Sequence, residues 1–215
     1  NTTTRRPSNA FNSINFAALK KDNHSRSSFI PSNNEFLEID ISAYHPTLAA
    51  KLVGYEFSNP DIHSEFATLY NVDYKTAKEL TFKQLYGGIW SEYQDKPFFK
   101  EVAMYVDGIW DTYQYGGYIK TENKIFIRDQ LDKITPQKLF NYIVQSKETS
   151  TNVDLLKLVF DKLKGKKTKL VLYTYDAFLF DYSNEDKGLI QEIVNILDYP
   201  VNIKQGKTYH GLEKL

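Results

Sequence analysis

"LVLYTYDAFLFD", residues 170–181, consists of two apolar, aromatic-rich runs separated by one carboxylate, Asp176. Each run has the length and the side chains of a buried strand, so the stretch predicts a hairpin with Asp176 at its turn. The stretch "EFLEIDI", residues 35–41, alternates with a period of two and predicts a further strand that ends near Asp40. The two strand-end carboxylates could meet in one sheet, although each could equally be a surface aspartate that ends its strand.

The composition indicates a folded chain and limits its chemistry. With 215 residues and 41% apolar side chains, it can form one large domain or two coupled subdomains. It contains no cysteine, which excludes disulfides, thiolate metal sites and a cysteine nucleophile, so a metal ion would take oxygen or imidazole ligands. No apolar run approaches the roughly 18 residues of a membrane span. We therefore expect a cytoplasmic protein without a membrane partner.

Charge is balanced overall but not along the chain. The 27 basic and 27 acidic residues give a net charge of zero, so no overall field attracts a polyanion. Residues 1–28, in contrast, hold a single acid, Asp22, among many Ser, Thr and Asn side chains. The basic residues of this segment are Arg5, Arg6, Lys20, Lys21 and Arg26. Such donors suit phosphate groups.

The remaining pattern predicts mostly helices, which places the chain in the α+β class. Ser42 can cap a helix that continues to about Lys51, with Pro46 in its first turn. The other expected elements are helices at 59–72, 73–88 and 97–115, a hairpin at 116–129, a helix at 136–163 with a break near Ser150, and a helix at 184–198.

Two aspartates in a chain without cysteine suit magnesium. Mg²⁺ binds one or two carboxylates and fills its remaining positions with water and substrate phosphates. Two such ions can stabilise the attacking and leaving oxygens of a phosphoryl transfer. Between the two aspartates, Lys78, Phe82 and Tyr86 recur every four residues and share one helix face. That face could bind a triphosphate, a sugar and a base, or it could pack into the core with Lys78 reaching solvent.

Together these segments resemble the palm and fingers of a family A DNA polymerase, the group that contains bacterial DNA polymerase I. "LEIDISAYHPTLAAKL" resembles motif A, which implies that Asp40 is a metal ligand. "KELTFKQLYGG" resembles motif B and implies that Lys78, Phe82 and Tyr86 bind the nucleotide. "YTYDAFLFD" resembles motif C and implies that Asp176 is the second metal ligand. The three segments follow one another in the family's order.

Shorter segments resemble further elements of the family. "TRRPS" and "NSIN" are similar to elements that touch primer and template, and "NYIVQ" is similar to a pair that reaches into the minor groove. "DIH" resembles an element whose histidine, His63 in this chain, contacts the triphosphate. The resemblance thus implies a DNA-binding role for Arg6, Ser8, Asn12, Asn15, Asn141 and Gln145.

The chain departs from the family in each of the three motifs. The arginine that opens motif B is replaced by Tyr74, with Lys75 as a possible substitute one residue along, which implies weaker binding of the triphosphate. The acid that lies five residues after the motif A aspartate, beneath the sugar, is replaced by His45. An imidazole nitrogen could bond to a ribose 2′-hydroxyl, so we expect His45 to relax the discrimination against ribonucleotides without reversing it. Motif C has Ala177 where a second acid is usual.

The resemblance implies a right-hand polymerase core with an antiparallel palm sheet, at 1–54 and 135–215, and mostly helical fingers, at 55–134. The implied reaction transfers a nucleotide from a dNTP to the 3′-hydroxyl of primer–template DNA and releases pyrophosphate. Its cofactor would be two Mg²⁺ ions, replaceable by Mn²⁺, held by Asp40, the Ile41 carbonyl and Asp176. Further expected partners are the family's thumb and exonuclease-like portion, which this chain lacks, and the expected location is a bacterial or phage-infected cell.

Two other functions stay open. A single-subunit RNA polymerase shares the equivalents of Asp40, Lys78, Tyr86 and Asp176, although Phe82 and the "DIH" element favour DNA synthesis. A catalytically inactive nucleic-acid-binding module is also compatible with the pattern, but the intact pair of aspartates argues against it.

Overall fold

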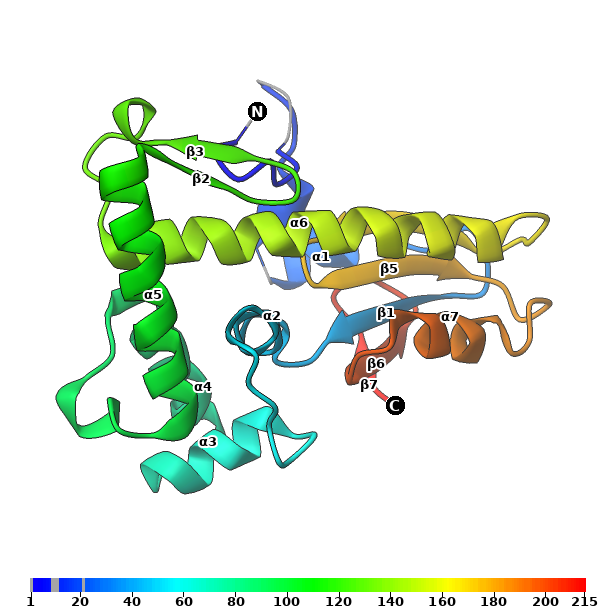
Figure 1. The fold of residues 1–215 in the computed structure, drawn as a ribbon. Coiled ribbons are helices and arrows are strands. Elements are labelled where there is room, and N and C mark those ends of the chain that lie inside the picture. Colours follow the sequence, from blue (N-terminus) through cyan, green and yellow to red (C-terminus); the bar gives the residue numbers. More distant parts are fainter. Residues whose placement is uncertain (1, 9–11, 21) are drawn as a thin grey trace. The chain divides into compact units, whose positions relative to one another are not determined.

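The computed structural model describes residues 2–8, 12–20 and 22–215, whose helices and strands group into two units (Figure 1). The sheet unit comprises Pro7–Ser42 and Thr151–Leu215, and the helical unit comprises Asn1–Arg6 and Ala43–Ser150. The predicted division into palm and fingers at 54 and 134 stays a prediction, because the borders of the two units follow contacts and not function.

An antiparallel sheet of five strands organises the sheet unit. In spatial order the strands are β4 (Lys169–Thr174), β5 (Ala177–Tyr182), β1 (Glu35–Ile41), β6 (Val201–Gly206) and β7 (Glu213–Lys214). The central strand β1 pairs with β5 on one side and with β6 on the other. The predicted strand at 35–41 and the predicted hairpin at 170–181 are confirmed.

The two faces of β1 carry different side chains, because successive residues of a strand point to opposite faces. Leu37, Ile39 and Ile41 share one face and are at most 4% exposed. On the other face Phe36 packs with Leu179 and Tyr209 in an apolar cluster. Along that second face the side chains change from apolar Phe36 to charged Glu38 and Asp40 as the strand approaches its end.

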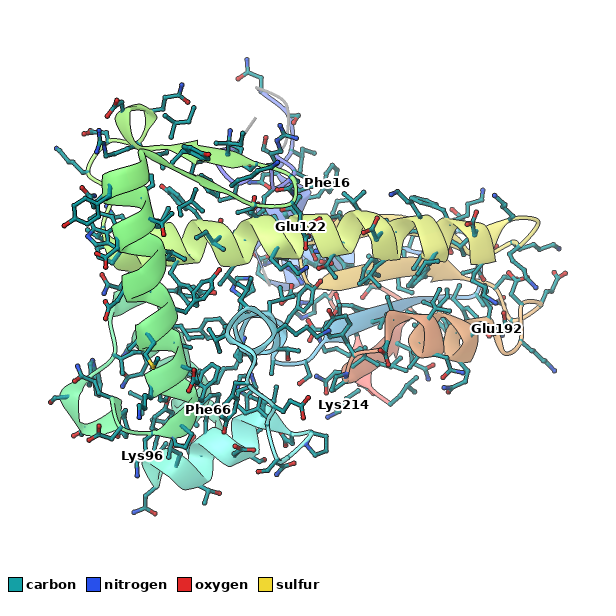
Figure 2. All side chains as sticks on the ribbon, in the orientation of Figure 1. Phe16, Phe66, Lys96, Glu122, Glu192 and Lys214 are labelled. Carbon is teal, nitrogen blue, oxygen red and sulfur yellow. The ribbon has the colours of Figure 1, made fainter. Side chains whose placement is uncertain are left out.

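Helices complete the sheet unit. Helix α7 (Leu189–Leu197) buries side chains spaced four residues apart, from Leu189 to Leu197. Glu192 of α7, labelled in Figure 2, pairs with Lys162 at a distance of 3.0 Å. Shorter turns precede β1, namely the 3-10 helix η1 (Phe16–Ala18) and helix α1 (Asn23–Ser27).

The helical unit is built around aromatic side chains. Its elements are α2 (Tyr44–Val53), α3 (Ile62–Tyr70), α4 (Tyr74–Gly87), η2 (Ser91–Tyr93), α5 (Pro97–Gly116), β2 (Tyr118–Lys120), β3 (Ile125–Ile127), η3 (Arg128–Gln130) and the first part of α6 (Pro136–Leu163). Figure 1 shows α5 running from the α3–α4 pair to the β2–β3 hairpin. The ring of Phe66, labelled in Figure 2, lies 5.6 Å from that of Phe98 and 5.7 Å from that of Phe99, between ring centroids.

Two predicted helix starts are confirmed. The side chain of Asp73 accepts a hydrogen bond of 3.0 Å from the Thr76 amide and opens α4 where the sequence predicts. Pro97 occupies the first turn of α5, where a missing amide hydrogen costs nothing.

Neither the 28-residue α6 nor any other described helix is long and apolar enough to cross a membrane.

Three expectations about helix ends are wrong. Ser42 does not cap α2, because Ala43, at φ +47°, is the cap residue and no side-chain hydrogen bond caps this helix start. Helix α6 does not break at Ser150 but continues from Pro136 to Leu163, and the neighbouring hydroxyl of Thr149 donates to the Gln145 carbonyl at 2.9 Å within the helix. The last helix begins at Leu189 and not at 184, after Gly188 in the left-handed conformation.

Strands β6 and β7 are not predicted from the sequence pattern. In β6 only Val201 and Ile203 alternate as apolar residues, and all six of its residues are half-buried. The pairing with β1, from Phe36 opposite Gly206 to Ile41 opposite Val201, therefore rests on backbone hydrogen bonds more than on a buried apolar stripe.

We expect the centre of the sheet to dominate the stability of the sheet unit. Phe178 on β5 is fully buried, so Phe178→Ala should lower the free energy of unfolding by about 3–5 kcal/mol through lost burial and a new cavity. Val171 on the outer strand β4 is 49% exposed, and Val171→Ala is the control, with an expected loss below about 0.5 kcal/mol. Urea unfolding followed by circular dichroism measures both losses, and equal losses would contradict this assignment of the core.

Candidate active site

Asp40 and Asp176 come from neighbouring strands of the sheet unit. The antiparallel register pairs Asp40 with Ala177, the residue that follows Asp176. The amide of Ile41 donates a hydrogen bond of 2.8 Å to the carbonyl of Asp176, which closes this end of the β1–β5 ladder. Asp40 is half-buried and Asp176 is exposed. The sheet therefore presents both aspartates, and the backbone of Ile41, at the same end of adjacent strands.

A buried amide holds the turn that carries Asp176. Tyr175 precedes it at φ +54°, in the left-handed region that costs free energy for a residue other than glycine. Asn152 of α6 is 1% exposed, and its side-chain nitrogen donates to the Tyr175 carbonyl at 2.7 Å and to the Tyr173 hydroxyl at 2.6 Å. The two hydrogens of one amide group thus hold the end of β4 and the residue that precedes Asp176.

The pKa of Lys204 reflects the negative charge of the carboxylates around it. Its ammonium nitrogen lies 2.9 Å from a carboxylate oxygen of Glu38, its partner across β1 and β6. Burial is the largest single influence and lowers the pKa of the Lys204 ammonium, but the hydrogen bond and charge of Glu38 together with the other nearby carboxylates outweigh it. The charges of Asp40 and Asp176 act in the same direction as Glu38, so the pKa of Lys204 is raised overall. All three carboxylates therefore act on one cation.

The donor set suits a cation that needs few protein ligands. No group of three or more His, Cys, Asp or Glu side chains that could hold a metal ion occurs among residues 2–8, 12–20 and 22–215. Asp40 and Asp176 are a set of two, and Mg²⁺ is the common ion that binds through two carboxylates together with water and substrate phosphates. The residues present at this end of the sheet therefore fit Mg²⁺.

The helical unit contains a chain of polar contacts around His45. The guanidinium of Arg6 donates from Nε to Oε2 of Glu148 at 2.5 Å, and its Nη2 lies 2.8 Å from Nε2 of His45. The other ring nitrogen, Nδ1, lies 2.5 Å from the hydroxyl of Tyr86. Oε1 of Glu148 lies 3.3 Å from Nε2 of His45. Burial raises the pKa of the Tyr86 phenol, which therefore stays protonated at neutral pH.

Aromatic rings enclose His45 on the side of α4. The centroid of its ring lies 6.1 Å from that of Phe82 and 5.8 Å from that of Tyr86, both in edge-to-face arrangements. Lys78, one turn before Phe82, is exposed. The predicted face of α4 thus exists, with two half-buried rings next to His45 and a cation at one end.

His63 is almost fully buried, whereas a side chain that binds a triphosphate must be accessible to it. It is 2% exposed, and neither ring nitrogen has a hydrogen-bond partner among the described residues. The ring of Tyr74 lies edge-to-face against it at 5.5 Å. Burial lowers the pKa of the His63 imidazole, and the charge of Lys78 lowers it further, while Asp61 acts in the opposite direction. His63 and Lys78 are therefore close enough to interact electrostatically.

The other predicted DNA contacts differ in their surroundings. On α6 the Gln145 amide donates to Asn141 at 2.7 Å, and Thr4 donates to Gln145 at 3.1 Å, so this pair is joined to the N-terminal segment. Three other predicted contacts, in the sheet unit, are exposed: Ser8, Asn12 and Asn15.

Not all of the basic N-terminal segment is directed at solvent. Arg6 contacts Glu148, and the guanidinium of Arg26 lies 4.4 Å from the ring centroid of Tyr209. Lys20 is exposed. The segment therefore offers fewer cations to a phosphate backbone than its composition suggests.

Sequence patterns miss three residues of these sites. Glu148 and Asn152 lie within a predicted helix and Lys204 lies in the unpredicted strand β6, and the groups on which they act are more than twenty positions away in sequence. The burial of Glu148 and Asn152 is visible only in the fold, so the sequence alone identifies neither residue nor its partner.

No protein-family model matches the sequence, and no curated protein matches it. Among solved structures the chain is similar to the POL domain of Pol1 from M. smegmatis in complex with DNA primer-template and dNTP, with a TM-score of 0.71 and 16% identity. The similarity covers 91% of this chain and 44% of that chain, so this chain spans less than half the length of its neighbour. The likeness confirms the predicted α+β fold of a polymerase domain.

His63 should make the stability of the protein depend on pH. Its pKa is lowered by burial, so the native ring stays neutral where the unfolded ring, with an ordinary pKa of about 6.5, is protonated. Below about pH 6.5 the unfolded state then binds more protons, and the free energy of unfolding falls as the pH falls.

The substitution His63→Leu should flatten that decrease and preserve stability at about pH 8, because the ring nitrogens have no hydrogen bonds to lose among the described residues. Urea unfolding at about pH 8 and about pH 5.5 measures the effect. His210→Gln, at an exposed histidine, is the control and should leave the pH dependence as it is. The same pH dependence in wild type and His63→Leu would refute this explanation.

Proposed function

We propose that the chain catalyses template-directed DNA synthesis by transferring nucleotides from dNTPs to the 3′-hydroxyl of a primer, with release of pyrophosphate. The observation that carries the proposal is the placement of Asp40 and Asp176 at one end of adjacent strands, where they act together on Lys204. A fold similar to a polymerase domain that was solved with DNA primer-template and dNTP supports it.

Asp40, Asp176 and the Ile41 carbonyl would hold two Mg²⁺ ions, which Mn²⁺ could replace. When bound, such ions lower the pKa of the attacking hydroxyl and neutralise charge on the phosphates. The chain's own contribution is to orient the two carboxylates. The β1–β5 register fixes Asp40, and the Asn152 amide fixes the turn before Asp176.

The nucleotide-binding residues of the proposal belong to the helical unit. Lys78 and His63 would face the triphosphate and neutralise the charge that develops on it. Phe82 and Tyr86 would face the base and sugar, with His45 beneath the sugar. Because His63 is covered by the Tyr74 ring, the proposal requires that Tyr74 move when a triphosphate binds.

DNA would bind through two groups of residues. Arg6, Asn141 and Gln145 would contact the minor groove or the primer terminus, and Ser8, Asn12 and Asn15 would contact the backbone of primer and template. Half or more of the hydrogen bonds to DNA usually go to phosphate and sugar, which suits the exposed polar side chains of the second group.

The central test removes one metal ligand. Asp176→Asn should reduce primer extension by about a thousandfold or more, because the amide cannot replace a carboxylate on Mg²⁺. The fold should persist, since Asp176 is exposed at a turn. Asp198→Asn is a matched control in the same unit, where asparagine tolerates the left-handed conformation of φ +52°.

The assay uses the protein with all flanking sequence that its gene encodes, a labelled primer–template and Mg²⁺. Full activity of Asp176→Asn would refute the proposed metal site. A wild type that binds DNA but extends no primer favours a nucleic-acid-binding module, and a wild type that prefers rNTPs favours an RNA polymerase.

DNA affinity should fall as the salt concentration rises, because basic side chains that bind DNA phosphates release counterions from the DNA. Lys20→Gln should reduce the slope of log affinity against log salt by about 1, as expected for one phosphate contact. Arg26→Gln should leave the slope unchanged, because Arg26 is engaged with Tyr209 and with the Leu19 carbonyl. Fluorescence anisotropy at several salt concentrations measures both slopes, and an affinity that does not depend on salt would contradict the proposed binding mode.

A further inference from the structure

Glu148 is a buried carboxylate to which the proposed reaction assigns no role. Its side chain is 2% exposed, whereas the side chains of its partners Arg6 and His45 are 20% and 16% exposed. Both Nε and Nη2 of Arg6 contact the same oxygen of Glu148, and the other oxygen faces the His45 ring. A buried carboxylate is costly unless it is paired, so Glu148 fixes the position of Arg6.

The contact with Arg6 determines which nitrogen of His45 carries the proton. A guanidinium can only donate, so at 2.8 Å from Nη2 of Arg6 the Nε2 atom of His45 must accept. In the neutral ring the proton then resides on Nδ1, which donates to the Tyr86 hydroxyl. Glu148 therefore acts on Tyr86 through Arg6 and His45.

Both nitrogens of His45 are engaged within the protein. The sequence-based expectation that a ring nitrogen bonds to a ribose 2′-hydroxyl requires a nitrogen that is free to do so. In the structure Nε2 is next to Arg6 and Nδ1 is next to Tyr86, and the rings of Phe82 and Tyr86 enclose the imidazole. A 2′-hydroxyl against this ring would lose its water and gain no hydrogen bond.

We propose that Glu148 is a positioning residue for sugar selection: by holding Arg6 against His45 it makes the His45 ring a contact that excludes a ribose 2′-hydroxyl. The inference rests on the proposed function, which places His45 beneath the sugar of the incoming nucleotide. The ligand class that this contact discriminates is deoxyribonucleoside against ribonucleoside triphosphates. Discrimination is then strict in the wild type and depends on a carboxylate that lies on α6, more than a hundred residues from His45.

The test compares single-nucleotide incorporation of a dNTP and of the matching rNTP by the full gene product. Glu148→Ala should raise the ratio of rNTP to dNTP incorporation by about tenfold, because Arg6 is released and a nitrogen of His45 becomes free to bond. Glu148→Gln should have a smaller effect, because its amide oxygen can still accept from Arg6. Glu122→Gln, at an exposed carboxylate paired with Lys147, is the matched control and should leave the ratio unchanged.

A rescue separates positioning from general stability. In the double variant His45→Glu with Glu148→Ala, the carboxylate is moved to α2, where it can pair with Arg6 and accept from the Tyr86 hydroxyl. The ratio should return toward the wild-type value. A merely structural role of Glu148 predicts no such return, because the space on α6 stays unfilled.

Two outcomes would overturn the inference. One is an active wild type whose ratio is unchanged in a folded Glu148→Ala or Glu148→Gln variant. The other is a proton on Nε2 of His45, read from the ¹⁵N shifts of the ring, which needs no catalytic activity. A wild type that incorporates neither nucleotide overturns the proposed function, and sugar selection with it, while the ¹⁵N shifts still decide whether the contacts around His45 are as described.

Discussion

The register of β1 against β5 is the constraint on which the candidate metal site depends. A slip of one residue would turn Asp40 to the opposite face of the sheet, because the side-chain period of a strand is two. Both ends of the pairing are held. At one end the buried carboxylate of Asp181 accepts from the amides of Ser32 and Asn33, at 3.1 and 2.8 Å, and at the other the Ile41 amide donates to Asp176. The hairpin that carries Asp176 therefore also fixes the strand that carries Asp40.

In the helical unit, a buried charge fixes the position of the N-terminal segment against α6. Glu148 needs a cation, and Arg6 reaches it from the N-terminal segment. Thr4 joins the same segment to α6 through Gln145 and through the hydroxyl of Thr149. An arginine that composition alone assigns to phosphate binding is thus part of the packing. The proposed contact of Arg6 with DNA must then use donors that Glu148 leaves available, which limits where the primer can lie.

The sequence predicts the parts of the structure that depend on local pattern. The strand at 35–41 and the hairpin at 170–181 follow from apolar runs, and α4 follows from its Asp73 cap. β6 is not predicted because only Val201 and Ile203 alternate as apolar residues, so its pairing with β1 alone defines it as a strand. The partners of Asn152 and Glu148 are not predicted because they lie far away in sequence. A polar residue inside a helix is predictable as unusual, but the group that satisfies it is set by tertiary packing.

The residue at position 45 can only be interpreted together with position 148. With a carboxylate at both positions, two like charges would compete for the single guanidinium of Arg6 in a poorly solvated site, at a cost that burial increases. With an acid at neither, Arg6 would lose its partner and no longer be held against α6. A histidine at 45 with a glutamate at 148 satisfies both conditions, because the neutral ring accepts from Arg6 while the carboxylate balances its charge. The carboxylate at position 148 therefore supplies the negative charge next to Arg6 that the neutral ring at position 45 does not carry.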